Sequence, residues 1–255
     1  MFPTGLSPDG TELLLVKRGD LDSDIYYSQF DGSLWSKAAP VRGDLNSNFT
    51  EDHASFGPDG NTIYLSSERR SSEGGLDIYV SKKRPDGTWG EPVNIGLPVN
   101  TEQDETAAYM SPDSSRFIFA SKGHFNMGGY DIFFCDVHQD GSVSAPVNIG
   151  YPINTTNDNT YFVPVKSGHS GVYARRHEEG VGNEDIWFME IIPREVTVAK
   201  SLTRLSEQNF TIRITDKETG EVITLEYDAI EDAIEVRSKT GKSYSVVYTR
   251  EGNEK

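Results

Sequence analysis

Apolar residues in this chain of 255 residues occur in short runs that turn-forming residues interrupt, without the period of a helix. In one representative stretch the runs predict four successive β-strands, at Asp52 to Phe56, Thr62 to Ser67, Asp77 to Lys82 and Trp89 to Ile95. The breaks between them fall at Pro58-Asp59-Gly60, Gly74-Gly75 and Asp86-Gly87. Pro presets φ for a turn and Gly accepts the positive φ that closes it, so we expect an antiparallel sheet of four strands.

This pattern occurs four times, as independent landmarks in one register show. The first landmark is a segment around a proline, at Leu6-Ser7-Pro8-Asp9-Gly10, Phe56-Gly57-Pro58-Asp59-Gly60, Met110-Ser111-Pro112-Asp113-Ser114 and Val163-Pro164-Val165. The second places Asp before Ile and an aromatic residue, at Asp24-Ile25-Tyr26, Asp77-Ile78-Tyr79, Asp131-Ile132-Phe133 and Asp185-Ile186-Trp187. The third joins Asp-Gly to a later Pro-Val pair in the first three copies. Regular spacings of 50 to 54 residues indicate an internal repeat.

A four-stranded sheet repeated in this way is typical of a β-propeller. We expect an all-β fold in which residues 1–192 form blades at about 1–50, 51–104, 105–157 and 158–192. A single blade has two apolar faces and is stable only between neighbours, which explains the repetition. A carboxylate at a strand start can accept N–H bonds from the adjoining turn, so we predict a structural role for the repeated aspartates, Asp24, Asp77, Asp131 and Asp185.

The repeat ends before the chain does. The fourth copy has no recognisable last strand, and two explanations fit: a longer propeller whose upstream blades this chain lacks, which we favour, or a four-bladed ring completed by Val196 to Ala199. For residues 193–255 the pattern predicts a separate small β domain, which would be a regulatory-like sandwich or part of one. Its hairpins are expected at Asn209 to Ile214 with Glu221 to Tyr227, and at Ala233 to Arg237 with Ser243 to Thr249.

Composition narrows the classes of partner. The chain has 40 acidic and 24 basic side chains, a formal charge of −16 and no dense basic segment, which argues against nucleic acid. The acidity indicates a well-hydrated surface or a cation site. Cys135 is the only cysteine, so no internal disulfide is possible, and its apolar neighbours predict a buried, inert thiol. No segment has the roughly 20 apolar residues of a membrane span, and the first residues do not resemble a signal peptide.

The repeats resemble the WD-like propeller repeats related to TolB. Ser7-Pro8-Asp9-Gly10, Asp24-Ile25-Tyr26 and the segment from Trp89 to Thr101 carry the resemblance, which covers about Phe2 to Ile191. In particular they are similar to the propellers of OmpA-family proteins of the Bacteroidetes type, some of which are type IX secretion components. In that family the propeller is followed by a regulatory-like β-sandwich and then by an OmpA-like peptidoglycan-binding domain. The segment from Ile214 to Glu221 resembles the opening of such a sandwich.

The resemblance implies a scaffold in the periplasm or at the outer membrane, with envelope proteins as partners. It implies no insertion of this chain into the membrane. No OmpA-like domain is recognisable here, so peptidoglycan contacts are expected only through domains absent from this chain.

No set of residues predicts catalysis. Gly168-His169-Ser170-Gly171 differs from a nucleophile elbow, and the five histidines lack the spacing of a zinc site. Asp20, Asp22 and Asp24 begin like a calcium loop, but Ile25 occupies the position of the glycine that makes the turn. We therefore predict no enzyme activity and no cofactor. For the segment with Asp20, Asp22 and Asp24 we predict a solvated acidic loop, and calcium binding is the minor alternative.

Residues that break the repeat are the best candidates for binding. Segments 68–72, 122–127 and 175–179 occupy one equivalent loop in three successive copies. Loops of the same order emerge on the same face of a propeller, so we predict a binding surface formed by Arg69, Arg70, His124, Phe125, Arg175 and Arg176. Its basic side chains would suit an anionic or acidic partner, and unrelated solvated loops are the alternative.

Two functions fit these observations. The favoured one is a non-catalytic protein-interaction scaffold of the bacterial envelope, because the repeat fold has no catalytic set. The alternative is a propeller that accompanies an enzyme, as in peptidases whose propeller gates a separate catalytic domain. The second predicts a hydrolase domain in the same full-length gene.

Overall fold

A computed structural model describes residues 1–19, 22–175, 185–190, 210–216, 222–227 and 244–250 of the chain. Every described regular element is a β-strand, and no helix in these ranges is long and apolar enough to cross a membrane. The chain divides into two units, Met1–Glu190 and Ile191–Lys255.

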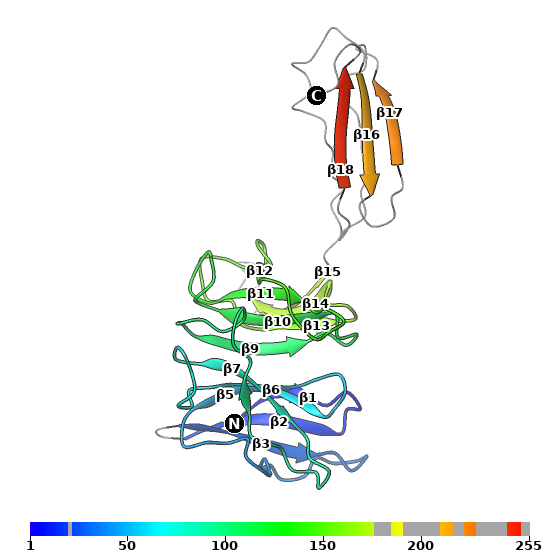
Figure 1. Ribbon diagram of the computed structural model, residues 1–255. Helices are drawn as coiled ribbons and strands as arrows, with labels where there is room; N and C mark the ends of the chain where they lie inside the picture. Colours follow the sequence, from blue (N-terminus) through cyan, green and yellow to red (C-terminus); the bar gives the residue numbers. More distant parts are fainter. Residues whose placement is uncertain (20–21, 176–184, 191–209, 217–221, 228–243, 251–255) are drawn as a thin grey trace. The chain divides into compact units, whose positions relative to one another are not determined.

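The first unit is a propeller of four blades that follow one another in chain order, from blue to yellow-green in Figure 1. Within each blade consecutive strands pair antiparallel. Blade 1 contains β1 (Phe2–Leu6), β2 (Glu12–Arg18), β3 (Ser23–Gln29) and β4 (Ala39–Pro40). Blade 2 contains β5 (Glu51–Phe56), β6 (Thr62–Ser67), β7 (Asp77–Lys82) and β8 (Val93–Asn94). Blade 3 contains β9 (Glu105–Met110), β10 (Arg116–Ser121), β11 (Asp131–Asp136) and β12 (Val147–Asn148), and blade 4 contains β13 (Phe162–Val165), β14 (Ser170–Arg175) and β15 (Asp185–Glu190).

The all-β propeller that the sequence predicts is confirmed, and the fourth strand of blade 2 is shorter than predicted. The expected strand from Trp89 to Ile95 is reduced to Val93–Asn94. Pro92 has no N–H to donate to a ladder, and Trp89 forms only isolated bridges, one with Lys83 of its own blade and one with Gly43 of blade 1. Its N–H donates to the Arg42 carbonyl of blade 1 at 2.9 Å, and its own carbonyl accepts from Asp44 at 3.0 Å. The residue predicted as strand therefore links two blades.

An apolar core fills each interface between consecutive blades. Between blades 1 and 2, Val16 and Ile25 pack with Ile63 and Leu65, and all four are fully buried. The equivalent cores contain Ile78 between blades 2 and 3, and Ile132 between blades 3 and 4, each facing aromatic side chains of the following blade. The apolar faces that no single blade can bury are thus buried in pairs.

A repeated asparagine fastens the third strand of each complete blade. Asn100 accepts the Ile78 N–H at 2.9 Å and donates to the Ile78 carbonyl at 2.9 Å, so its amide acts as one residue of a neighbouring strand. Asn46 makes the same pair of bonds with Ile25, and Asn154 with Ile132. The side chain extends the sheet where the backbone of the fourth strand has ended.

In the second unit the described strands are β16 (Phe210–Asp216), β17 (Val222–Tyr227) and β18 (Tyr244–Arg250). They form an antiparallel sheet in the order β17-β16-β18. The hairpin predicted between β16 and β17 is present, whereas β18 pairs with β16. The predicted strand from Ala233 to Arg237 and the segment from Val196 to Ala199 lie outside the described residues.

Candidate functional site

The two described loops that carry predicted binding residues, β6–β7 and β10–β11, emerge at one end of the propeller. In every complete blade the second strand ends, the third begins and the fourth ends at this edge, because neighbouring strands are antiparallel. Hydrogen bonds join these segments: Asn94 donates to the Ser71 carbonyl in blade 2, and Asn148 to the Phe125 carbonyl in blade 3. We call this end the loop face, meaning the β2–β3, β6–β7 and β10–β11 loops and the connections after β4, β8 and β12.

Arg69 lies inside the protein and not on the loop face surface. It is 7% exposed, and its Nη2 lies 3.3 Å from Oε1 of the fully buried Glu51. It also donates to the Leu45 carbonyl at 2.8 Å and lies over the Tyr79 ring. The Arg69 cation is paired with the buried Glu51 carboxylate, so its charge is used within the fold.

The remaining arginines are placed only in part. Arg70 is exposed, beside the open hollow that Phe49 and Glu91 also line. Arg175 ends β14, and Arg176 lies outside the described residues. Among described residues, the structure therefore leaves Arg70 as the exposed basic member of the predicted set.

His124 and Phe125 are adjacent but face different surroundings. The His124 ring packs against Phe119 and Phe133, with centroids 5.8 and 5.2 Å away, and its Nε2 lies 2.9 Å from the Val99 carbonyl. Phe125 is 97% exposed. His124 therefore anchors the β10–β11 loop, and Phe125 projects from it.

Other exposed apolar side chains lie on the segments to which this loop is hydrogen-bonded. Leu97 and Tyr151 occupy the same position in the connections after β8 and β12, and they are 80% and 74% exposed. The β10–β11 loop is hydrogen-bonded to both connections. His124 of the loop bonds to the Val99 carbonyl after β8, and Asn148 at the end of β12 donates to the Phe125 carbonyl of the loop. We call Leu97, Phe125, Tyr151 and the half-exposed Met127 the apolar cluster of the loop face.

The sequence did not indicate this cluster, apart from Phe125. Leu97 and Tyr151 sit beside prolines in a segment that repeats, and no prediction was made for either. Their available signal was position: each follows the glycine that ends the fourth strand, where a connection must run over the surface.

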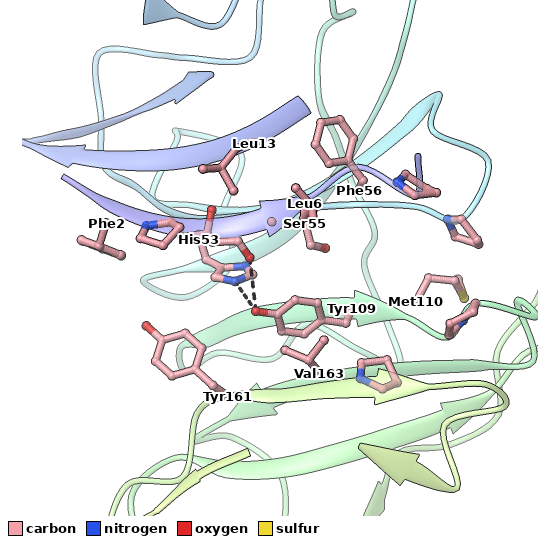
Figure 2. A pocket seen from close by; sticks show the side chains of 17 residues that line it. Phe2, Leu6, Leu13, His53, Ser55, Phe56, Tyr109, Met110, Tyr161 and Val163 are labelled. Atoms are coloured by element: carbon pink, nitrogen blue, oxygen red, sulfur yellow. Dashed lines mark hydrogen bonds between the residues drawn. The ribbon is translucent and has the colours of Figure 1, made fainter. Parts of the chain in front are cut away.

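A second hollow lies among the first strands of the blades. It has a volume of about 800 Å³ and is lined mainly by apolar and proline side chains. Figure 2 shows the labelled residues that surround it, among them Phe2 and Leu6 from β1, Phe56 from β5, and Val163 from β13. This volume is typical of small-molecule sites, but polar groups that could orient a ligand are few.

His53 and Tyr109 point toward one another at this hollow (Figure 2). His53 Nε2 lies 2.9 Å from the Tyr109 hydroxyl, which donates to the Thr4 carbonyl at 3.4 Å. Burial lowers the pKa of His53 to about 3, so its imidazole is neutral, and burial raises the pKa of Tyr109. A neutral imidazole that donates to a tyrosine links three blades, since Thr4, His53 and Tyr109 belong to β1, β5 and β9.

The repeated aspartates lie at the starts of third strands. Asp77 is fully buried, and its Oδ2 accepts the Glu73 N–H at 2.9 Å and the Asn94 amide at 2.7 Å. Asp131 makes equivalent bonds, with the Met127 N–H and the Asn148 amide. Each carboxylate thus holds the preceding loop to the end of the fourth strand. Asp24 is half-buried, and the side chain of Asp185 is not described.

The calcium candidates are only partly described, because Asp20 lies outside the described residues. Asp22 is exposed. The pKa of Asp24 is raised, mainly by the partial burial of its own carboxylate and secondly by the negative charge of Asp22. Within the described ranges the structure groups no three His, Cys, Asp or Glu residues in a way that could hold a metal ion. Cys135 is buried, and burial raises the pKa of its thiol to about 12.

No model of a protein family matches the sequence, and no curated protein matches it. Among solved structures, the chain is similar to a putative TolB from Agrobacterium tumefaciens, with 18% identity and a TM-score of 0.44 over 75% of this chain and 58% of that chain. It is also similar to an alpha-L-arabinofuranosidase from Lactobacillus brevis, with 14% identity and a TM-score of 0.47 over 71% and 69% of the two chains.

A third similar structure is the periplasmic gluconolactonase of Pseudomonas aeruginosa, with 13% identity and a TM-score of 0.39 over 88% and 65% of the chains. This chain spans 58% of the TolB length. At such identities a likeness concerns the fold alone.

Proposed function

We propose that this chain is a non-catalytic scaffold that binds a partner protein through the apolar cluster of the loop face. The observation that carries the proposal is the exposure of Phe125, 97%, on a loop whose neighbouring residue is anchored in the core. A large aromatic side chain held outside the fold by a rigid loop is a typical anchor of protein interfaces.

The chemistry of the cluster supports an apolar partner surface more than an anionic one. Arg69 is neutralised by Glu51, and Lys122, next to the loop, lies 2.7 Å from Asp104. Exposed apolar side chains that gather in one place favour a binding site, whereas scattered ones need no explanation. Burying a side chain of the size of Phe125 in a partner contributes about 2–3 kcal/mol.

Photo-crosslinking tests this assignment directly. A photoreactive phenylalanine at position 125 should capture a specific protein in the source cell. The control position is Leu34, which is 72% exposed in the β3–β4 loop, at the opposite end of blade 1 from the loop face. Capture of the same proteins from both positions would refute a specific site.

A variant series tests the energetic side. Leu97→Ser, Phe125→Ser and Tyr151→Ser combined should abolish retention of the captured partner, because each removes an exposed apolar contact without opening the core. Leu34→Ser, the matched control, should retain it. Equal retention by both variants would show that the cluster does not bind.

We further propose that the scaffold acts in the bacterial envelope. The support is the resemblance of the repeated Ser-Pro-Asp-Gly and Asp-Ile-aromatic segments to envelope propellers. Fractionation of the source cell with an antibody against the chain should place it with periplasmic or outer-membrane markers. Its recovery with cytoplasmic markers would overturn this part of the proposal and leave the binding surface untouched.

A further inference from the structure

The isoleucine of the Asp-Ile-aromatic segment marks the face of a blade that the next blade covers. Ile25, Ile78 and Ile132 are at most 2% exposed, because each lies in the core between its own blade and the following one. Ile186 holds the same position in blade 4 and is 81% exposed, and Phe188 on the same strand is 65% exposed. Blade 4 therefore presents the face that packs against a neighbour in the other three blades.

Blade 1 presents the opposite half of such an interface. In blade 2, three side chains that face blade 1 are fully buried: Ile63, Leu65 and Tyr79. Strand register places three similar side chains at the same positions of blade 1, where they are only half-buried: Leu13, Leu15 and Tyr26. The first blade thus carries, half-buried, the equivalent of the apolar set with which blade 2 covers blade 1.

The tryptophans at equivalent positions show the same difference. Trp89 of blade 2 is 5% exposed, and it lies so close to Gly43 of blade 1 that a Cβ there would be 2.2 Å from the Trp89 carbonyl oxygen. Trp35 is the equivalent residue of blade 1, and it is 43% exposed, with its ring 5.3 Å from Phe30. A tryptophan that joins blades elsewhere in the fold is left at the surface here.

We propose that a second copy of this chain covers both faces, with blade 4 of each copy packed on blade 1 of the other. One chain contains both halves of a standard interface between blades, and the contact would continue the three interfaces already present. Because Ile186 and Trp35 are both exposed, the two halves do not meet within one chain.

Two copies with four blades each give eight, which lies within the usual range of about four to eight blades per propeller. Head-to-tail contacts of this kind form a closed ring when the rotation closes. The proposed assembly is therefore a dimer with two identical contacts and one continuous ring.

Sedimentation analysis of the full chain tests the proposal. The wild-type chain should sediment at about twice its mass of 28.3 kDa. Ile186→Glu and Trp35→Glu should each weaken association at least about tenfold per contact, since each places a carboxylate in a face that must become apolar. Val93→Glu is the matched control, because Val93 is 63% exposed on blade 2, away from both faces, and should leave the dimer intact.

Mixing the two variants gives a result specific to head-to-tail association. A mixture of Ile186→Glu and Trp35→Glu chains can form one unaltered contact, from the intact blade 4 of one to the intact blade 1 of the other. The mixture should therefore dimerise more strongly than either variant alone, with circular dichroism spectra unchanged.

A monomeric wild-type chain would overturn the proposal. So would a dimer that Ile186→Glu leaves unaffected. A third result would also overturn it: the chain is a monomer, and Ile186 becomes buried only in a longer polypeptide with additional repeats before residue 1. The two faces would then belong to blades of one polypeptide and not to two copies.

Discussion

Replacing Asn100 by alanine should destabilise the propeller more than the removal of so small a side chain would suggest. The side chain is fully buried and makes three hydrogen bonds: from the Ile78 N–H, to the Ile78 carbonyl, and to Asn94 Oδ1 at 2.7 Å. The Ile78 carbonyl also accepts the Ile95 N–H at 3.1 Å and so keeps a partner after the change. The Ile78 N–H does not keep this acceptor, and it is buried with the rest of the residue.

The magnitude follows from these bonds. Loss of net hydrogen bonding contributes about 1 kcal/mol, and a buried N–H without an acceptor adds about 1–3 kcal/mol, so Asn100→Ala should cost about 2–4 kcal/mol. Asn100→Asp should also destabilise the propeller, because it keeps an acceptor for the Ile78 N–H but replaces the donating amide by a buried carboxylate oxygen that faces the Ile78 carbonyl and Asn94 Oδ1. Such a loss is a large fraction of the 5–15 kcal/mol that stabilises a typical domain.

Urea unfolding followed by tryptophan fluorescence measures this loss. Asn61→Ala is the matched control, because Asn61 is exposed and its amide donates only within its own turn, to the Asp59 carbonyl. The control should change the free energy of unfolding by less than about 0.5 kcal/mol. An equally small change for Asn100→Ala would refute the role of the asparagine as a substitute strand residue.

Three further outcomes follow from the buried polar groups. Arg69→Ala should cost about 3–5 kcal/mol in urea unfolding because it leaves the Glu51 carboxylate buried without its cation, while Arg70→Ala should be near neutral; similar values would contradict the assignment. The depressed pKa of His53 means that the unfolded chain takes up a proton near pH 6.5 and the folded chain only near pH 3, so stability should fall as the pH drops through this window and His53→Gln should flatten the fall; a His53 NMR signal that titrates near pH 6.5 would oppose this. Cys135 should react with a thiol reagent only after unfolding, and rapid labelling of the native chain would show that the thiol is accessible.

The fold could be predicted because its signals are local and repeated. Turn residues such as Pro58 and Gly60 fix the hairpins, and one turn per copy defines the register of a whole blade. The predicted strands Thr62 to Ser67 and Asp77 to Lys82 coincide with β6 and β7. The missing part of the prediction concerned contacts between blades: Trp89 bridges Lys83 of its own blade, but its N–H and carbonyl bond to the blade before it, which the sequence did not predict.

For the candidate site, the sequence predicted the position of the loops better than the surroundings of their side chains. Equivalent loops do emerge on one end, since antiparallel pairing determines the side of each loop. What a sequence does not reveal is whether a charged side chain in such a loop faces solvent. Arg69 and Arg70 are adjacent and identical in type, yet only Arg69 has a buried carboxylate within reach. The apolar cluster was missed for a related reason, because a repeating apolar residue is core in most positions and exposed in this one.

The loops of blades 2 and 3 are anchored by different residues, and Phe125 is exposed on the second of them. Both loops follow a serine whose hydroxyl accepts the N–H two residues later, so Gly123 is the equivalent of Arg69. An arginine cannot occupy that position in blade 3, because a Cβ on Gly123 would lie 1.8 Å from Thr101 Oγ1.

Without an inward arginine, the buried Glu105 of blade 3 is satisfied by hydroxyl and N–H groups of Thr101 and by Ser121, and burial raises its pKa. The loop is then anchored by His124, which inserts between aromatic rings of its own blade. The next side chain, Phe125, points outward. The loops of blades 2 and 3 thus differ in two ways: a buried cation is replaced by glycine, and Ser71 is replaced by Phe125, the exposed aromatic residue that we propose binds a partner.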